Sequence, residues 1–291
     1  MQPALTYDPN PRAPRWRLPA GACDAHVHVF GPAARFPFAQ DRGFTPGDAP
    51  KEALFALHRQ LGIERCVIVQ SLCHGLDNRV VEDAIAAGAG NYLGVALLPL
   101  DVSDEELERL AGAGFRGVRF NFAKALNPAF DVDGVVAFTR RLEPLGMHLQ
   151  VHFERGLIHA LAAPLARSAV PVVVDHMARL DAAHGLAQPD FIALHALMKN
   201  PLFRVKLSGI DRITHDAGRD SYRDGVAIAH RLLHDFPERC FWGTDWPHPL
   251  HDHVPDDAML VDALAQIAPD AALREQLLVH NPQRFYRFAA S

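Results

Sequence analysis

The stretch ACDAHVHV, residues 22–29, is the first of a series of short apolar runs that together predict the fold. A run of this length and composition is typical of a buried β-strand. Between such runs lie longer segments whose apolar residues recur every three or four positions, as in amphipathic helices. The seven further strand candidates are CVIVQS (66–71), YLGVALL (92–98), GVRFNF (117–122), HLQVHF (148–153), PVVVDH (171–176), FRVKLSG (203–209) and CFWGTDW (240–246).

The segments with a helical period separate these strands. Ser103 followed by acidic residues is a typical helix start. The clearest helix candidates are KEALFALHRQL (51–61), NRVVEDAIAAG (78–88), SDEELERLAGAG (103–114), VDGVVAFTRRLEPL (132–145) and RDGVAIAHRLLHDF (223–236). Eight strands alternating with helices predict an α/β protein with a single (β/α)₈ TIM barrel. An open doubly wound sheet is the alternative, but no GxGxxG or GxxxxGK[ST] motif follows a strand.

The proline-rich residues 1–20 are expected to form an extended N-terminal arm, and residues 21–291 the barrel. The arm lacks the apolar segment of a signal peptide, and no apolar run is long enough to cross a bilayer. The net charge of −5 and the absence of a basic tract argue against nucleic acid or membrane partners. Four scattered cysteines without a CxxC pair indicate reduced thiols and a cytoplasmic location.

Polar side chains gather where the predicted strands end. The carboxyl ends of barrel strands carry the active site in TIM-barrel enzymes. Polar residues returning to the same end of successive strands therefore predict the site there. The residues are His26, His28, Arg119, Asn121, His152, Asp175, His176, Ser208, Arg212, Thr244 and Asp245.

The chemistry of this set is consistent with two kinds of site. His26 and His28 are two residues apart, so their side chains point to the same face of a strand. Together with His152, His176 and Asp245 they form a possible ligand set for one divalent ion such as Zn²⁺. Without a metal, the imidazoles can hydrogen-bond a substrate carbonyl oxygen while Asp245 acts as general base on water. Both possibilities remain open from the residues alone.

Several motifs in this order resemble the amidohydrolase superfamily, amidohydrolase family 2. HxH on the first strand, histidines ending strands five and six, and an aspartate ending strand eight carry the resemblance. The segments DAHVHVFGP, VQSLCHGLDN, GVRFNF, VVDHMAR, WGTDWPHP and PQRFYRF are similar to the 2-pyrone-4,6-dicarboxylate lactonase group. The likeness covers nearly the whole chain from about residue 15.

The resemblance implies hydrolysis of a small anionic lactone from the breakdown of aromatic or sugar-derived acids. Members of the lactonase group work without a metal, whereas other relatives depend on one. Either no cofactor or one zinc ion is therefore expected. By the resemblance, Asp245 activates water, and the lactone carbonyl is polarised by His26, His28 and His176. The positions expected to contact the substrate are His74, Arg119, His152, Arg179 and Arg212. A guanidinium suits carboxylate recognition because it pairs bidentately. A monomer or small homo-oligomer is expected.

Four positions depart from the lactonase pattern. Phe44 and His152 replace tyrosines, Leu72 replaces a serine and Ala125 replaces an arginine. Lys124, beside Ala125, is a possible compensation. These changes fall on substrate recognition, so we expect a related lactone with fewer or differently placed anionic groups. His152 would also complete the five-ligand set of the metal-dependent relatives.

Two other functions compete with this interpretation. One is a metal-dependent decarboxylase of an unsaturated keto acid, and the other is a non-catalytic binding protein on the same barrel. Replacing Asp245 should abolish turnover in an enzyme, whereas a binding protein has no reason to retain the complete histidine and aspartate set.

Some polar residues also have structural explanations. Arg119 is a possible salt-bridge partner of Asp175, and Lys206 or Ser208 is expected to face the barrel interior. Asp24 and Asp77 suit helix or turn capping. Trp242 and Trp246 flank Asp245 and are expected to exclude water from it. Loop or surface positions are expected for His148, His248, His251 and His253, with His248 close enough to Asp245 to support it.

Overall fold

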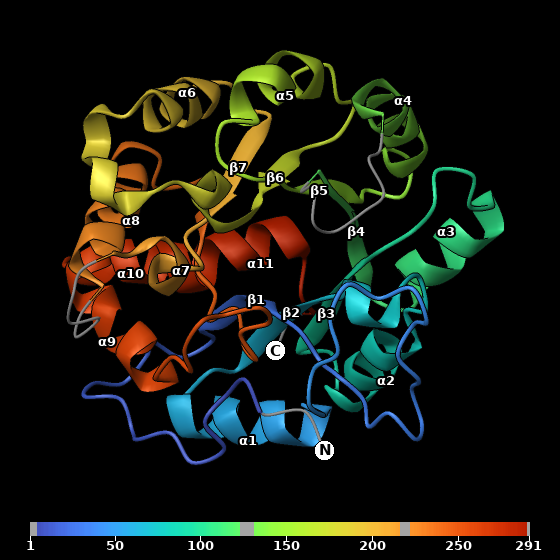
Figure 1. The fold of residues 1–291 in the computed structure, drawn as a ribbon, viewed down its shortest axis with the longest axis horizontal. Helices are drawn as coiled ribbons and strands as arrows, with labels where there is room; N and C mark the ends of the chain where they lie inside the picture. The colour runs from blue at the N-terminus through green and yellow to red at the C-terminus, as the bar shows by residue number, and fades with distance from the viewer. Residues whose placement is uncertain (1–4, 123–130, 216–221, 290–291) are drawn as a thin grey trace.

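The computed structural model describes residues 5–122, 131–215 and 222–289, and within them eight parallel strands form one sheet in sequential order (Figure 1). A backbone hydrogen bond from Ala25 N to Trp242 O, 2.8 Å long, joins the first strand to the segment after the last. The predicted (β/α)₈ barrel is therefore confirmed. The strands are β1 Cys23–Val27, β2 Arg65–Val69, β3 Tyr92–Ala96, β4 Phe115–Asn121, β5 His148–His152, β6 Val172–Val174, β7 Phe203–Lys206 and β8 Cys240–Phe241.

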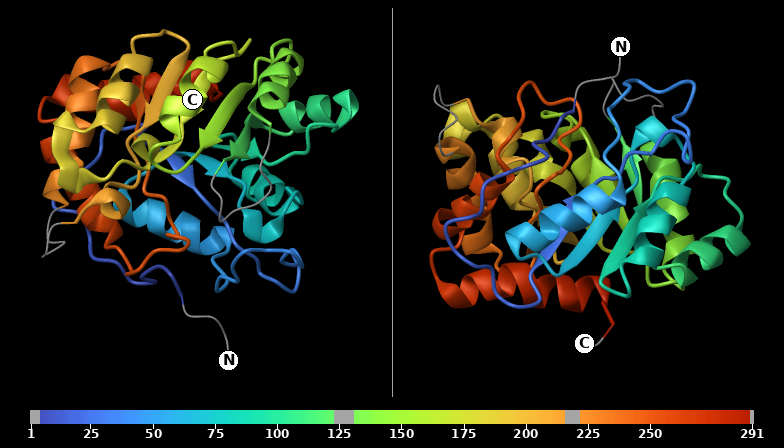
Figure 2. Two further views of the ribbon diagram at one scale, coloured as in Figure 1. Left: turned by 45° about the horizontal axis from the view of Figure 1, so that its top comes forward. Right: turned by 90° about the horizontal axis from the view of Figure 1, so that it is seen from below.

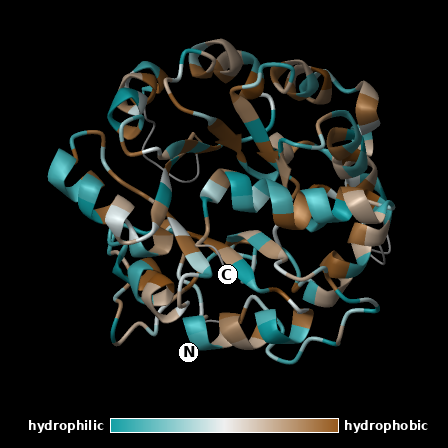
Figure 3. Cartoon of the chain, turned by 180° about the vertical axis from the view of Figure 1, so that it is seen from behind, coloured by the Kyte–Doolittle hydropathy of each residue, from teal (hydrophilic) through white to brown (hydrophobic). Residues whose placement is uncertain are grey.

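Helices surround the sheet, and all five helix candidates are present. The Oγ of Ser103 accepts a hydrogen bond from Glu106 N at 3.2 Å, as its sequence predicts. In Figure 3 the helices carry bands of hydrophilic and hydrophobic residues, as expected when one face packs against a sheet. The α-helices are α1 Lys51–Leu61, α2 Arg79–Ala87, α3 Asp104–Gly112, α4 Val132–Leu142, α5 Ile158–Leu165, α6 Pro189–Leu197, α7 Ile210–Ile213, α8 Arg223–Asp235, α9 Asp257–Ile267, α10 Ala271–Glu275 and α11 Asn281–Tyr286. None of the helices in the described ranges is long and apolar enough to cross a membrane.

The apolar residues form two cores. The larger fills the space between strands and helices, and the smaller fills the barrel interior. Helix α11 lies across one end of the barrel (Figure 2, right), where Tyr286 and Phe288 belong to the interior core. His148 is buried there, with its ring 5.1 Å from that of Phe285 and 5.6 Å from that of Tyr286. The expectation of a surface position for His148 was wrong, because it faces inward at the start of β5.

The segment before β1, residues 5–22, contains no helix or strand and runs along the outside of the barrel. Arg12 pairs with Asp256 and with Asp262, at 2.7 Å in each case, and thereby attaches the segment to α9. The ring of Tyr7 lies edge-on to Trp246, with centroids 4.8 Å apart. The segment therefore contacts the β8–α9 connection, which also contains Asp245.

Candidate active site

An irregularity in β1 sets the direction of the first two site histidines. The register between β1 and β2 shifts between Asp24 and Val27, and Asp24 Oδ1 accepts a hydrogen bond from His26 N at 3.1 Å. Such bulges re-aim side chains and are frequent beside active sites. His26 is fully buried, and His28 nearly so. The Nδ1 of His28 donates to Val69 O at 2.7 Å, so in the neutral ring Nε2 carries the lone pair.

Asp245 lies in the loop after β8, directly beside His26. Asp245 N donates to His26 O at 2.8 Å. The close approach of this loop to β1 depends on Gly243, because a Cβ atom there would lie only 2.7 Å from His26 N and 2.8 Å from His26 Cβ. Trp242 and Trp246, on either side of Asp245, are almost completely buried, in line with the expectation that they exclude water. A glycine two residues before the aspartate therefore lets two distant parts of the chain meet.

His176 and Arg179 belong to a left-handed turn, not to a strand. Strand β6 ends at Val174, and residues 176–179 all have φ between 48° and 59°. L-residues adopt this conformation at a cost of about 1–2 kcal/mol each, so consecutive examples are rare and concentrate at functional sites. The predicted strand to His176 was wrong for this reason. His176 Nδ1 lies 2.9 Å from Ser208 Oγ, which fixes its ring.

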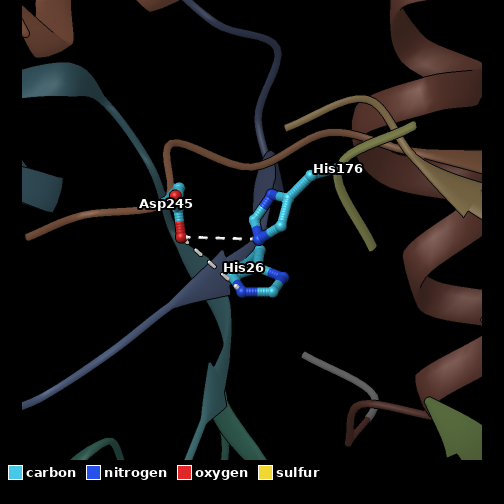
Figure 4. Close-up of side chains that lie close together, drawn as sticks. All are labelled: His26, His176 and Asp245. Atoms are coloured by element: carbon cyan, nitrogen blue, oxygen red, sulfur yellow. Dashed lines mark ion pairs between the residues drawn. The ribbon is translucent and has the colours of Figure 1, made fainter. Parts of the chain in front are cut away.

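The ring nitrogens of three histidines face one carboxylate oxygen. Asp245 Oδ1 lies 3.7 Å from His26 Nε2, 3.5 Å from His28 Nε2 and 3.8 Å from His176 Nε2. Figure 4 shows His26 and His176 converging on this oxygen from two elements. Within the described residues, neither Asp245 Oδ1 nor His26 Nε2 has a hydrogen-bond partner, although both are buried. The arrangement leaves room for a reacting atom among these groups.

The surroundings determine the charge of this cluster. Burial raises the pKa of Asp245, but the charge of Arg212 and the nearby histidines outweigh it and hold the pKa well below its usual value. Burial lowers the pKa of His26 to about 4, with a further contribution from the charge of Lys206. Burial also lowers the pKa of His176 well below its ordinary value. At neutral pH the carboxylate of Asp245 therefore faces the neutral imidazoles of His26 and His176.

The positions of these donors fit a divalent ion. His26, His176 and Asp245 offer ligand atoms that all lie within 4.8 Å of one another. Ligands bound at about 2.0–2.2 Å in a tetrahedral zinc site are roughly 3.3–3.6 Å apart, close to the separations from Asp245 Oδ1. The partnerless Nε2 of His26 and Oδ1 of Asp245 face each other across 3.7 Å. His28 is not one of these three, but its Nε2 lies 3.5 Å from Asp245 Oδ1, so it would be the fourth ligand of such an ion.

His152, the fifth predicted ligand, is not among the three with mutually close donor atoms. Its Nδ1 lies 3.2 Å from Asn121 Oδ1, and its ring centroid is 5.7 Å from that of His176. Asn121 Oδ1 can only accept, so His152 Nδ1 donates to it. His152 also lines the cavity that opens above the cluster.

A cavity of about 170 Å³ opens above the cluster. Arg119, Arg179 and Arg212 line it, as expected. Phe44 and Leu72, two of the four departures from the lactonase pattern, also line it, whereas Ala125 and Lys124 lie outside the described residues. The complete lining is His28, Phe44, Ser71, Leu72, Arg119, His152, Glu154, His176, Arg179, Arg212, Asp245, Pro249 and Leu250.

Two of the three arginines have a carboxylate partner within the protein. Arg119 Nε donates to Asp175 Oδ2 at 2.7 Å, which is the salt bridge considered from the sequence. Arg212 Nε pairs in the same way with Asp245 Oδ2. Arg179 forms no ion pair with any residue in the described ranges. Burial and then the charge of Arg212 lower the pKa of Arg179, so an anion bound beside it would be strongly favoured.

Other predicted residues have different surroundings from those expected. His74 does not line the cavity: its Nε2 accepts from Gly31 N at 3.1 Å and its Nδ1 lies 3.2 Å from Pro37 O. It holds two loop segments together, so the expected substrate contact is not found. Asp24 lies within β1 and caps no helix; besides His26 N, two residues on, it accepts from the distant Thr244 N, at 3.1 Å in each case. His251 lies in a loop, as expected, with its Nε2 2.7 Å from the buried Asp211.

Two further residues clarify the sequence expectations. Asp77 accepts from Arg79 N at 3.2 Å, which is the turn-capping role predicted for it. His248 is fully buried, with Nε2 3.1 Å from Asp257 Oδ1, and its N donates to Asp245 O at 2.8 Å. It therefore supports the loop of Asp245, as expected.

The sequence did not predict four residues that line the cavity, because nothing in their local pattern marks them: Ser71, Glu154, Pro249 and Leu250.

Comparison with known proteins decides the family. The amidohydrolase family model matches residues 23–288. This chain belongs to the amidohydrolase family. It is 43% identical over 290 residues to the 2-pyrone-4,6-dicarboxylate hydrolase of Comamonas testosteroni, covering 97% of this chain and 95% of that one. It is 37% identical over 280 residues to the 4-sulfomuconolactone hydrolase of Hydrogenophaga intermedia, with 94% and 90% covered.

A solved structure supports the same relationship. The crystal structure of a candidate 2-pyrone-4,6-dicarboxylic acid hydrolase from Pseudomonas putida matches with a TM-score of 0.82. That match has 30% sequence identity and covers 94% of this chain and all of the other. The resemblance predicted from the motifs is thus confirmed, and these relatives support a hydrolase that acts on ester bonds.

Proposed function

We propose that this protein hydrolyses a small anionic lactone, opening the ring with water. The observation that carries the proposal is the buried Asp245 Oδ1 faced by three imidazole nitrogens at the floor of a cavity lined by Arg179. A general base and groups that polarise a carbonyl are the requirements for attack of water on an ester. The lactone hydrolases among the relatives support the same reaction.

Each member of the cluster has a role in this reaction. Asp245 takes a proton from water as the water oxygen forms a bond to the lactone carbonyl carbon. His26 and His176 stabilise the negative charge that develops on the carbonyl oxygen. His28 presents a lone pair at Nε2, so we assign it to hold the attacking water beside Asp245, and not to polarise the carbonyl as the resemblance implied. The ring C–O bond then breaks and the proton passes to the leaving oxygen, so one water is consumed.

A divalent ion held by His26, His28, His176 and Asp245 would supply Lewis-acid polarisation and a lower pKa of bound water. The residues themselves provide the remaining requirements: a charged carboxylate, fixed ring orientations and almost complete burial of Asp245 and His26. Fixed dipoles and charges in such surroundings stabilise a transition state without reorganisation.

The cavity walls indicate the kind of lactone. The lining combines positive charge from Arg119, Arg179 and Arg212 with apolar surface from Phe44 and Leu72. A guanidinium pairs bidentately with a carboxylate or a similar planar anion. We infer a substrate with an anionic group beside Arg179 and an uncharged edge against Phe44.

We also propose a cytoplasmic location for the protein, which its four buried, free cysteines fit.

A panel of lactones tests this proposal. The purified chain is assayed with 2-pyrone-4,6-dicarboxylate, muconolactone-type substrates and neutral lactones of similar size, by loss of ring absorbance and by titration of the acid released. We expect one acid group per ring opened, and at least about tenfold higher kcat/KM for anionic than for neutral lactones. Release of CO₂ from an unsaturated keto acid, without ring opening of any lactone, would support the decarboxylase alternative. Lactone binding without turnover would support the binding protein.

A further inference from the structure

A lysine lies directly beneath the catalytic cluster. Lys206 on β7 is fully buried in the barrel interior, with Nζ 2.9 Å from Gln150 Oε1 and 3.2 Å from His26 Nδ1. An ammonium group has three hydrogens to donate and no lone pair to accept one. The ring nitrogen that receives this bond must therefore carry the lone pair. In the neutral imidazole the hydrogen is then on the other nitrogen, His26 Nε2.

Asp175 is the competing partner for the same ring nitrogen. Its Oδ1 lies 3.3 Å from His26 Nδ1 and its charge favours a protonated ring, but among the described residues no N–H meets that oxygen with hydrogen-bond geometry. A ring N–H points in the plane of the ring, so a short distance without alignment does not make the bond. The other oxygen, Oδ2, accepts from Arg119 Nε at 2.7 Å and from Gln150 Nε2 at 3.1 Å. Asp175 is thus engaged mainly with these two donors.

We propose that Lys206 is a positioning residue that fixes His26 with its hydrogen on Nε2, making it a donor toward the lactone carbonyl oxygen and opposing metal ligation. A ring nitrogen that carries a hydrogen has no lone pair for a metal ion. Ligation through His26 Nε2 would require that hydrogen to leave, or to move to Nδ1 and displace the bond from Lys206. The identity of the acceptor as a lactone oxygen rests on the proposed function, but the tautomer does not.

His28 shows the opposite arrangement. Its Nδ1 faces the carbonyl oxygen of Val69, which can only accept, so Nδ1 carries the hydrogen and Nε2 the lone pair. His26 in β1 and His28, just past its end, therefore present a donor and an acceptor to the same oxygen of Asp245, at 3.7 and 3.5 Å. A donor suits the developing negative charge and an acceptor suits the attacking water. The buried partners of Nδ1, Lys206 and Val69, set this division.

The tautomers can be measured in the native protein. The full chain is labelled with ¹⁵N-histidine and treated with a chelator, and long-range ¹H–¹⁵N NMR spectra distinguish the two tautomers of each ring. The variants His26→Gln and His28→Gln assign the signals by their disappearance. We expect hydrogen on Nε2 of His26 and on Nδ1 of His28. Hydrogen on Nδ1 of His26 would overturn the proposal. Because no lactone is used, this result is independent of whether the proposed function is correct.

A variant tests whether the lysine is the cause. In Lys206→Met we expect the hydrogen of His26 to move to Nδ1 and the affinity for added Zn²⁺ to rise by about tenfold or more, measured against a chromogenic chelator. Lys199→Met removes an exposed lysine and is the matched control, with zinc affinity and tautomer unchanged. An unchanged tautomer and zinc affinity in Lys206→Met would contradict the proposal. If Lys206→Met does not fold, the spectrum of the native protein decides alone.

Discussion

The hydroxyl of Thr244 donates a hydrogen bond of 2.6 Å to Oδ2 of Asp24 and so fastens the loop after β8 to β1. The other oxygen of Asp24 accepts from His26 N and from Thr244 N, at 3.1 Å in each case. One buried carboxylate therefore fixes the backbone of His26 and of the residue before Asp245. The distance between the general base and the first histidine depends on this connection.

Replacing Thr244 with valine keeps the shape of the side chain and removes its hydroxyl. Thr244→Val leaves Asp24 Oδ2 without this partner, and Trp246 N loses the acceptor it now has at 3.1 Å. We expect a loss of about 1–3 kcal/mol in the free energy of unfolding and a lower kcat, measured by denaturant titration and steady-state kinetics. The exposed Thr45→Val is the control. Equal effects of the two substitutions would show that the bond to Asp24 does not hold the loop.

Arg179 is predicted to bind the anionic group of the substrate. Arg179→Met should raise KM for an anionic lactone by about 10- to 100-fold, because a charge-assisted pair is lost, while a neutral analogue is affected little. Arg155→Met is a suitable control, since Arg155 lines the neighbouring outer depression and not the inner cavity. A similar rise in KM for charged and neutral lactones would argue against this role.

The left-handed turn after β6 gives a prediction about stability. Ala178 has φ of 59°, a conformation that costs an alanine about 1–2 kcal/mol and a glycine very little. In Ala178→Gly this relief offsets the lost methyl group and the greater freedom of the unfolded chain. We expect the free energy of unfolding to change by less than about 0.5 kcal/mol, whereas Ala56→Gly in α1 should lose about 1 kcal/mol. A loss in Ala178→Gly as large as in Ala56→Gly would mean that the turn is unstrained.

Asp235, at the end of α8, makes stability depend on pH. Burial alone raises its pKa, but hydrogen bonds from His234, Arg231 and His195, at 2.9, 2.6 and 2.7 Å, hold the pKa well below its usual value. A lowered pKa stabilises the fold above the unfolded-state pKa of about 4, and this contribution disappears as the pH falls toward the folded-state value.

The variant Asp235→Asn lacks this contribution. We expect it to be less stable than the native chain by about 1–2 kcal/mol at pH 7, with the difference shrinking below about pH 4, in denaturant titrations across the pH range. Asp41→Asn, in an exposed loop, is the control. A difference that is constant with pH would show that the charge of Asp235 does not cause the effect.

The barrel and the members of its central cluster could be predicted because both depend on local patterns. Short apolar runs fix strands, and strands in a closed barrel must bring their carboxyl ends together. For that reason the sequence could predict that four residues lie close together: His26, His28, His176 and Asp245. The strand that was expected to reach His176 ended two residues earlier, at Val174. The left-handed residues 176–179 include no glycine, so nothing in this segment of the sequence indicated their conformation.

The hydrogen-bond partners of polar side chains were harder to predict than the end of the barrel at which those side chains lie. His74 was expected to contact substrate, yet both of its ring nitrogens face backbone groups of a distant loop. Asp24 was expected to cap a helix or turn, but it lies within β1 and its carboxylate also accepts from the distant Thr244. The alternation of Lys206 and Ser208 did not distinguish their roles: Lys206 contacts His26 and Ser208 contacts His176. Such pairings depend on strand register and loop paths that no single segment specifies.

The role of Asp245 is the central claim, and Asp245→Asn tests it most directly. The amide keeps the size of the side chain but cannot accept a proton from water. The measurement is kcat of ring opening for the preferred anionic lactone, with lactone affinity from isothermal titration and folding from circular dichroism. We expect kcat to fall by a factor of about 10³ or more, while the variant remains folded and binds the lactone. Full activity in a folded Asp245→Asn would contradict the account.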